Sequence, residues 1–318
     1  MSRIGLINNP NSGPTASADK CSALESEAAR HLVPVVTTRN PDEIADALRS
    51  FARAGVEVLA IHGGDGTVDA VLTRLRRDNA FKQEPVLAII PGGTTNMTHS
   101  DVGTRRRGAN ALGHLAAACL DGIPHRRVRS RRVLRVDRGG NAPPFYGFFF
   151  ATAAIPRLIH VTRKRLHRRG LTGWTSEAIA LLWSLRRLVS GRVARDSVMH
   201  PDRIAYAVDD GDWKTADTVI LMATTLERLI LGLRPARPGG RMGVAGLMWP
   251  YRRLGWRLPG FVRGRGDGEL GDDLGRTTAD RLRLRLDCDY TIDGELFDAP
   301  QSGEITLSAT EPARFLVV

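Results

Sequence analysis

The sequence predicts an α/β domain with a doubly wound parallel sheet, followed by a second, β-rich domain. Over roughly the first hundred residues, apolar strand-like runs alternate with helical patterns, which is typical of a parallel sheet covered on both faces. After about residue 125, strand-like segments with alternating polar residues follow one another with few helices between them. A chain of 318 residues is long enough for two cores, and we place the domains at 1–128 and 129–318.

Each element of the first domain has its own signal in the sequence. Helix-forming residues predict a helix at 16–31, and a stripe of apolar residues at helical spacing predicts another after residue 66. Between them, Asn40 predicts a helix start, since its side chain can cap a helix whose first residue is Pro41. Short apolar runs predict the strands, at 3–8, 33–36, 56–61 and 86–90.

The second domain contains strand-like segments and one helical insertion. The insertion spans about 156–195, and from Trp174 to Val189 its apolar residues fall on one helix face. The segment 259–275 is rich in glycine and charge, which predicts a mobile loop. The predicted strands are 131–136, 203–208, 218–222, 282–287 and 304–308.

Composition limits the class of protein. The formal charge is +12, and all but four of the 46 basic residues are arginine, which suits polyphosphates, anionic lipids or nucleic acid without choosing among them. Three distant cysteines predict neither a disulfide framework nor a zinc cluster and suit the cytoplasm. No apolar run reaches the length needed to span a bilayer, so we expect a cytoplasmic protein with, at most, peripheral contact with an anionic membrane.

Two glycine-rich turns, each directly after a predicted parallel strand, carry the main functional signal. The first turn contains Gly63, Gly64, Asp65 and Gly66, and the second lies at 91–96. Glycines can adopt positive φ and bring backbone N–H groups close to anionic oxygens, and the helix after the first turn points its positive end the same way. Because ligands bind at the carboxyl ends of parallel strands, the two turns predict a phosphate site.

The presence of carboxylates near a phosphate site needs a chemical explanation, because both groups are negatively charged. Asp65 would be repelled by phosphate unless a cation lay between them, so we expect it to bind Mg²⁺, which prefers carboxylate, water and phosphate oxygens. Much later in the chain, Asp293 and Glu295 flank a glycine at the end of a predicted strand. Transfer of a phosphoryl group to an alcohol needs a base, and Asp293 can serve as that base, with Glu295 orienting it or assisting the metal.

The motifs at 62–68 and 91–96 resemble the two signature turns of the diacylglycerol kinase catalytic-domain family, which includes sphingosine and ceramide kinases. The turn at 9–13 resembles its first phosphate turn, and 293–295 its late acidic motif. The resemblance implies an α/β nucleotide-binding domain, a β-sandwich domain and phosphorylation of a lipid hydroxyl with ATP and Mg²⁺. It also implies that the last strand packs back on the first domain. The nucleotide-binding residues that we expect are Asn9, Ser12, Gly13, Thr38, Gly63, Gly64, Gly66, Thr67, Gly92, Gly93, Thr94 and Asn96.

The chain departs from the family pattern at several positions. Asp69 and Ala70 replace the usual Asn-Glu, Met97 to His99 replace the usual Asp-Phe-Ala, and 151–156 replaces a glycine-rich strand end. These departures keep a catalytically silent nucleotide- or lipid-binding relative open as an alternative. An NAD kinase also stays open, because NAD kinases share the first glycine-rich turn and also transfer phosphate to a hydroxyl. Nucleic-acid binding has only the net charge in its favour, so we expect no specific nucleic acid partner, whereas a homodimer stays open. The basic run at 163–169 is a candidate contact with anionic head groups.

Overall fold

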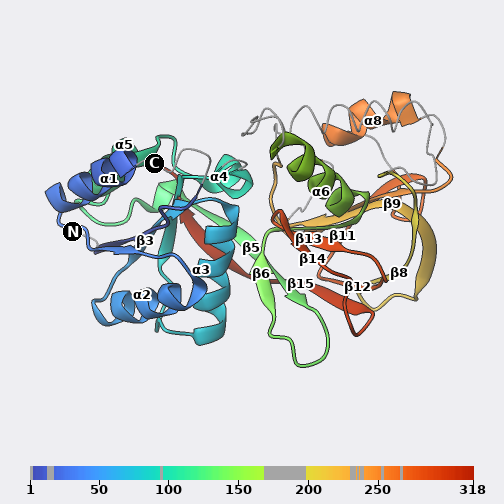
Figure 1. Cartoon of the computed structure of the whole chain (residues 1–318), viewed down its shortest axis with the longest axis horizontal. Helices are drawn as coiled ribbons and strands as arrows, with labels where there is room; N and C mark the ends of the chain where they lie inside the picture. Colours follow the sequence, from blue (N-terminus) through green and yellow to red (C-terminus); the bar gives the residue numbers. More distant parts are fainter. Residues whose placement is uncertain are drawn as a thin grey trace. The chain divides into compact units, whose positions relative to one another are not determined.

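The computed structural model describes residues 3–12, 18–93, 96–167, 198–229, 234, 236, 240–251, 254–265 and 268–318 (Figure 1). The chain divides into two compact units. The first comprises Met1–Arg131 and Pro312–Val318, and the second comprises Arg132–Glu311. The predicted fold class is confirmed, because the first unit has a parallel sheet covered by helices and the second is rich in antiparallel strands.

The first unit is built on parallel strands in the order β2-β1-β3-β4. Next to β4 lies the end of β15 (Glu304–Leu316), which joins it in parallel through Phe315 and Leu87. The last strand therefore contributes its final residues to the sheet of the first unit. The other strands are β1 (Ile4–Asn8), β2 (Val35–Thr37), β3 (Val58–Gly63) and β4 (Val86–Pro91).

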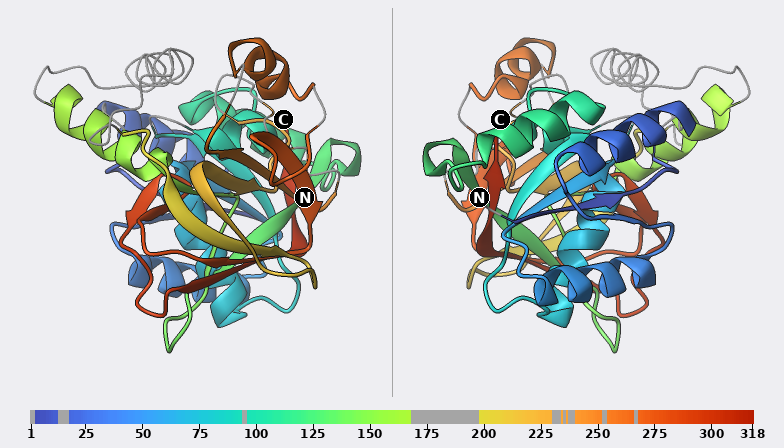
Figure 2. Two further views of the ribbon diagram at one scale, coloured as in Figure 1. Left: turned by 90° about the vertical axis from the view of Figure 1, so that its right-hand side faces the viewer. Right: turned by 90° about the vertical axis from the view of Figure 1, so that its left-hand side faces the viewer.

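Helices cover both faces of this sheet (Figure 2). Helices α1 (Ala18–Arg30) and α5 (Gly108–Ala118) pack together on one face, where Leu24 and Leu112 share a buried cluster with Leu6 and Ala60 of the strands. Helices α2 (Pro41–Arg53) and α3 (Asp65–Asp78) pack together on the other face. The short helix α4 (Met97–Val102) follows the second glycine-rich turn. The doubly wound arrangement results from burial of both sheet faces.

The predicted cap of α2 is confirmed. Asn40 has extended backbone, and its Oδ1 accepts hydrogen bonds from the N–H groups of Asp42 (3.1 Å) and Glu43 (2.9 Å). The carboxylate of Glu43 in turn accepts a hydrogen bond from the Arg39 N–H at 2.5 Å. These bonds satisfy N–H groups that have no partner within the helix, which is why the helix starts at Pro41.

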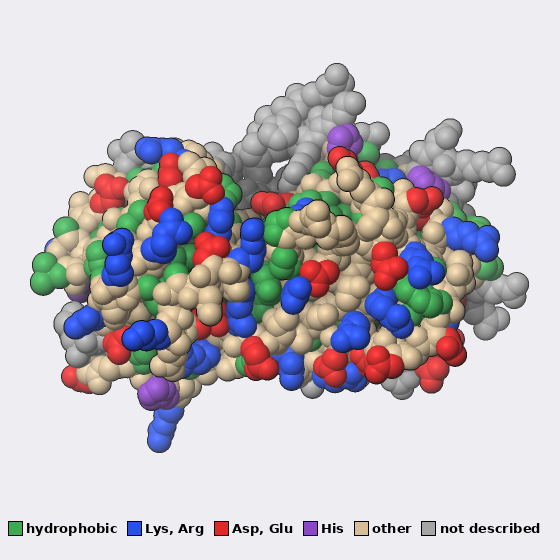
Figure 3. All heavy atoms as spheres, turned by 90° about the horizontal axis from the view of Figure 1, so that it is seen from below, with side chains coloured by type: hydrophobic (Ala, Val, Ile, Leu, Met, Phe, Trp, Pro, Cys, Tyr) green, Lys and Arg blue, Asp and Glu red, His purple; other side chains and the backbone are tan. Residues whose placement is uncertain are grey.

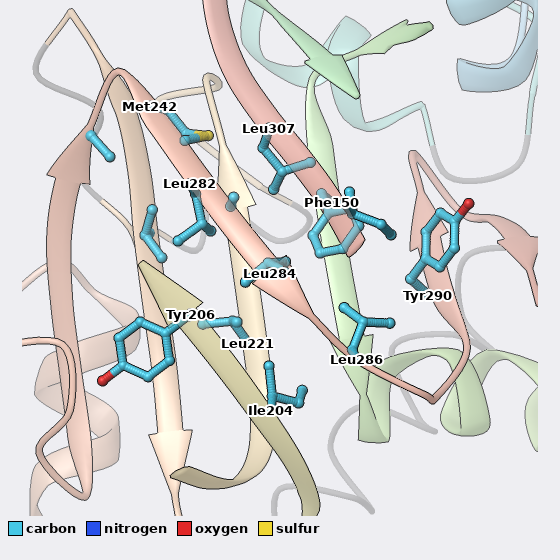
Figure 4. Packing of buried hydrophobic residues seen from close by; sticks show 14 of the residues in the cluster. Phe150, Ile204, Tyr206, Leu221, Met242, Leu282, Leu284, Leu286, Tyr290 and Leu307 are labelled. Carbon is cyan, nitrogen blue, oxygen red and sulfur yellow. The ribbon is translucent and has the colours of Figure 1, made fainter. Parts of the chain in front are cut away.

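Antiparallel strands dominate the second unit, where β9 (Lys214–Thr224) pairs with β7, β8 and β10. Their buried side chains form one apolar cluster, in which Phe150, Leu221 and Leu284 lie close together (Figure 4). The other strands are β5 (Val128–Asp137), β6 (Phe145–Gly147), β7 (Phe149–Ala153), β8 (Asp202–Val208), β10 (Met242–Met248), β11 (Leu274–Ala279), β12 (Arg281–Arg285), β13 (Tyr290–Ile292) and β14 (Glu295–Phe297).

The structure corrects one prediction and leaves another untested. The segment 259–275 is not a mobile loop throughout, because its first residues end helix α8 (Leu254–Val262) and its last begin β11. Of the helical insertion, the structure describes α6 (Ala154–His167). The apolar face from Trp174 to Val189 lies outside the described residues, as do the side chains of the basic run. In the described part of the chain, no helix combines the length and apolar character needed to cross a membrane.

Candidate nucleotide site and acidic turn

The two glycine-rich turns lie side by side at the carboxyl ends of β3 and β4. Gly63 is in register with Pro91, and the Gly92 N–H donates to the Gly63 carbonyl oxygen at 2.9 Å. The turn after β1 joins them, because the Asn9 N–H donates to the His62 carbonyl oxygen at 3.0 Å. The structure therefore brings together three turns that the sequence places far apart.

Four glycines of these turns form what we call the glycine cradle (Gly63, Gly64, Gly92 and Gly93). Close packing around them explains why these positions have no side chain. A Cβ on Gly64 would lie 3.1 Å from Gly93 Cα, and a Cβ on Gly92 would lie 2.7 Å from Ser12 Oγ. The expectation of positive φ was wrong: Gly64 has φ −90° and ψ −177°, and no member of the cradle is in the positive-φ region. A Cβ on Gly64, Gly92 or Gly93 would meet a neighbouring turn, whereas a Cβ on Gly63 would overlap the side chain of Thr67.

Asp65 joins the first turn to the helix that follows the second. Its Oδ2 accepts a hydrogen bond from the Met97 N–H (2.8 Å) and its Oδ1 one from the Thr98 N–H (3.0 Å). These are the first residues of α4, so the carboxylate caps that helix from a distant part of the chain. Asp65 is only 8% exposed, and burial raises the pKa of its carboxyl group while the two backbone hydrogen bonds oppose the rise.

Asn96 holds the second turn closed. Its Oδ1 accepts a hydrogen bond from the Gly93 N–H (3.0 Å), and its Nδ2 donates to the Gly93 carbonyl oxygen (2.5 Å). The residue has φ 47° and ψ 48°, a left-handed conformation that Asn adopts more readily than most residues. Asn96 therefore shapes the backbone that would meet the phosphates.

The remaining predicted residues of the first unit lie around the same turns. Asn9 Nδ2 donates to Thr67 Oγ1 at 2.9 Å, and Thr67 is nearly buried. Ser12 Oγ donates to the Asn9 carbonyl oxygen at 2.9 Å. Thr38, at the end of β2, is buried and its N–H donates to the Asn8 carbonyl oxygen at 2.9 Å. Gly66 lies in the first turn of α3, whereas Gly13 and Thr94 lie outside the described residues.

Helix α3 begins at the cradle with its N-terminal groups available. Among the described residues, no side chain caps its start at Gly64. The helix spans 14 residues, so its dipole favours an anion at this end. Together with the close-packed glycine backbone, this end of α3 fits a phosphate group better than any uncharged ligand.

Asp293 lies in the second unit, in the two-residue turn of the β13–β14 hairpin. Both Asp293 (φ 47°) and Gly294 (φ 92°) have positive φ, which is typical of a type I′ turn. The carboxylate is 7% exposed, and its Oδ2 accepts a hydrogen bond from the Phe148 N–H at 2.7 Å. Glu295, in contrast, is exposed at the start of β14.

The described residues do not form a metal cage. They contain no group of three His, Cys, Asp or Glu side chains placed to hold an ion. Both oxygens of Asp65 already accept hydrogen bonds, so this residue reaches a cation only through its remaining lone pairs. The site fits Mg²⁺ only as an ion that brings phosphate and water oxygens with it.

Sequence reasoning missed several residues that shape these sites. Asn8 and His62 connect β1 and β3, with 2.7 Å between Asn8 Oδ1 and His62 Nδ1, and burial lowers the pKa of His62. Gly147 contacts the Asp293 carboxylate so closely that a Cβ there would overlap Oδ2. In the sequence, Gly147 only interrupts an apolar run, and this did not indicate that it contacts Asp293. Asp69, which the sequence showed only as a departure from the family pattern, is completely buried in α3.

Comparison with known proteins shows which proteins share these features. The model of the diacylglycerol kinase catalytic domain matches residues 3–125. A diacylglycerol kinase structure from Bacillus anthracis is 15% identical, with a TM-score of 0.61 over 98% of this chain and 96% of that chain. A candidate diacylglycerol kinase from the same bacterium is 17% identical, with a TM-score of 0.64 over 100% and 97% of the two chains. A comparison with curated proteins gives no match.

The two kinds of comparison support different statements. At these identities the solved structures show a shared fold that extends over both units, whereas the family match concerns the unit with the glycine cradle. Residues 3–125 of this chain are therefore similar to the diacylglycerol kinase catalytic domain.

Proposed function

We propose that the protein is a lipid kinase that transfers the γ-phosphoryl group of ATP to a lipid hydroxyl. The observation that carries the proposal is the glycine cradle, in which two turns pack backbone against backbone beside the uncapped start of α3. Backbone N–H groups at a helix start favour phosphate. The family of residues 3–125 favours a lipid as the acceptor.

The first unit supplies the nucleotide site in this proposal. The glycine cradle lets the triphosphate approach the main chain, while Asn96 and the Asn9–Thr67 hydrogen bond hold the turns in place. Mg²⁺ neutralises phosphate charge when bound, with most of its ligands coming from phosphate and water oxygens. Asp65 can add only its remaining lone pairs to that set and also holds α4 in position.

The second unit supplies the base. Asp293 would accept the proton of the lipid hydroxyl as that oxygen bonds to the γ-phosphorus and ADP leaves. The hydrogen bond from Phe148 N–H to Oδ2 fixes the orientation of the carboxylate. Glu295 directly follows the turn and is exposed, so in this proposal it assists the reaction but is not the base.

The test is transfer of labelled phosphate from ATP by the purified protein. Separate reactions would contain mixed lipid extract, diacylglycerol, a sphingoid base and NAD, each with and without Mg²⁺. The proposal expects a labelled lipid that needs Mg²⁺ and no labelled NAD. Labelled NAD in place of lipid would assign the chain to NAD phosphorylation. No product with any acceptor, together with measurable ATP binding, would indicate a catalytically silent relative.

A further inference from the structure

Many basic side chains of the protein lie close to acidic ones. Basic and acidic side chains alternate over the face shown in Figure 3, and the first unit contains ion pairs such as Arg74–Asp42 (2.6 Å) and Arg76–Glu84 (2.9 Å). One group of exposed arginines in the same unit departs from this pattern, and we call it the arginine rim. It consists of Arg105, Arg106, Arg107, Arg126, Arg127 and Arg129.

The fold brings the two arginine runs of the rim to either side of one strand. The Arg105 N–H donates to the Val318 carbonyl oxygen (2.7 Å), and the Val317 N–H donates to the Arg127 carbonyl oxygen (3.0 Å). Hydrogen-bonded strands lie about 4.8 Å apart, so the two backbones are on the order of 10 Å from each other across the end of the chain. The two backbone segments that carry these six exposed arginines therefore lie close together at the end of the chain.

Acidic side chains do not neutralise this surface. Asp101, the acidic residue just before the first arginine run, has a side chain that is only 2% exposed, and its carboxylate binds Arg131 at 2.8 Å. The first turn of α5, which begins after Arg107, contains no acidic residue. Within the described residues, none of the six rim arginines forms an ion pair with a carboxylate. The rim arginines can therefore form ion pairs with an anionic partner.

The rim begins at the same edge of the sheet as the glycine cradle. Thr104, directly before Arg105, donates to the Ile89 carbonyl oxygen from its N–H (3.0 Å) and from its Oγ1 (3.1 Å). Ile89 lies in β4, which leads into the second glycine-rich turn. An anionic surface that binds the rim would therefore lie beside the phosphate site.

We propose that the arginine rim docks the protein on an anionic phospholipid bilayer. The inference rests on the proposed function, because a kinase whose acceptor lies in a membrane must hold its phosphate site at the bilayer surface. Guanidinium groups bind phosphate through two hydrogen bonds, and each basic residue near an anionic leaflet strengthens binding about fivefold. Nucleic acid is disfavoured because the segments 104–107 and 125–129 contain no Phe, Tyr or Trp for base stacking.

Vesicle sedimentation with two matched variants tests the proposal. The rim variant is R105Q/R106Q/R126Q. The control variant R39Q/R53Q/R77Q removes three exposed arginines elsewhere in the first unit. Wild type should bind phosphatidylcholine vesicles that contain about one third phosphatidylglycerol and should not bind pure phosphatidylcholine. The rim variant should bind at least about tenfold more weakly, whereas the control should stay within about twofold of wild type.

Three results would overturn the docking surface. They are absence of wild-type binding to the anionic vesicles, equal binding by wild type and the rim variant, and an equal loss in the control. If the rim variant loses affinity for ATP but not for vesicles, the arginines bind the nucleotide instead. If wild type binds duplex DNA more tightly than vesicles and the rim variant loses this binding, the partner is nucleic acid. Either result would also contradict the proposal.

A kinase assay separates failure of the docking surface from failure of the proposed function. With lipid dispersed in neutral detergent micelles, wild type and the rim variant should have equal rates, since docking is not required there. If wild type phosphorylates no lipid in micelles or vesicles but still needs the rim for vesicle binding, the kinase function fails and the docking surface stands. If the enzyme is active but vesicle binding does not depend on the rim, the docking surface fails and the kinase function stands.

Discussion

Gly64 and Gly93 pack backbone against backbone, so that a Cβ on Gly93 would overlap Gly64 Cα. This contact joins the turn after β3 to the turn after β4. The position therefore tolerates no side chain, although neither glycine needs a positive φ.

Gly93→Ala should destabilise the first unit by about 1–3 kcal/mol and weaken ATP binding, because the added methyl group separates the two turns. Urea unfolding and calorimetric titration with ATP would measure the two effects. Gly260→Ala is a suitable control, since a Cβ on Gly260 would meet its nearest neighbour at 3.9 Å. Equal stability of Gly93→Ala and wild type would contradict the close packing.

Asp65→Asn should destabilise the protein by about 1–3 kcal/mol, because an amide accepts only one of the two N–H groups that the carboxylate accepts. The unmatched N–H of Met97 or Thr98 would loosen the start of α4. Urea unfolding measures the loss. If Asp65 acted only as a metal ligand, the variant would lose Mg²⁺-dependent activity while keeping wild-type stability.

Asp293→Asn should lower kcat by about 100-fold or more and leave the KM for ATP nearly unchanged, as expected for loss of a base. Asn tolerates the left-handed conformation of this turn and can still accept the Phe148 N–H, so the hairpin should persist. Steady-state kinetics with the accepted lipid gives both constants. Glu295→Gln, at the exposed position, should lower kcat less than Asp293→Asn does. An equal loss of kcat in both variants would contradict the assignment of Asp293, rather than Glu295, as the base.

His99 should make stability fall at acidic pH. Burial is the main cause that lowers its pKa from 6.5, and its Nε2 lies 2.7 Å from the Thr104 carbonyl oxygen. Because the unfolded chain binds the proton more readily, the stabilising contribution of neutral His99 is present above pH 6.5 and is lost as the pH falls below it.

The comparison for His99 is the His99→Gln variant, whose amide can still donate to Thr104. Between about pH 7.5 and 5.5, wild type should lose more unfolding free energy than the variant. His62, whose pKa burial also lowers, is present in both proteins, so its contribution cancels. Parallel pH profiles of the urea midpoint would exclude a role for His99.

Asn40→Ala should cost about 1 kcal/mol, since it removes the acceptor of the N–H groups of Asp42 and Glu43 at the start of α2. Thermal unfolding of the two proteins measures the change. Asn40→Asp retains an acceptor and should restore stability. If Asn40→Asp were as unstable as Asn40→Ala, the lost hydrogen bonds could not explain the effect.

The sequence by itself determined the features that depend on neighbouring residues. Apolar runs located strands β1 to β4, and apolar periodicity with helix-forming residues located helices α1 to α3, because burial on a sheet or helix face repeats at a fixed spacing. Helices α4 and α5 were not predicted. Asn40 located the start of α2 because a cap acts within a single turn. The two glycine-rich turns were recognisable because each directly follows a buried strand.

Only the tertiary structure decided which of these local features meet. Sequence reasoning interpreted Asp65 as a metal ligand but did not show that the packing of α4 beside α3 brings its carboxylate to the Met97 and Thr98 N–H groups. It also expected positive φ at Gly64, although the close approach of a second turn is what excludes a side chain there. Such contacts depend on how distant strands align in the sheet, and no property of a short stretch of sequence encodes that alignment.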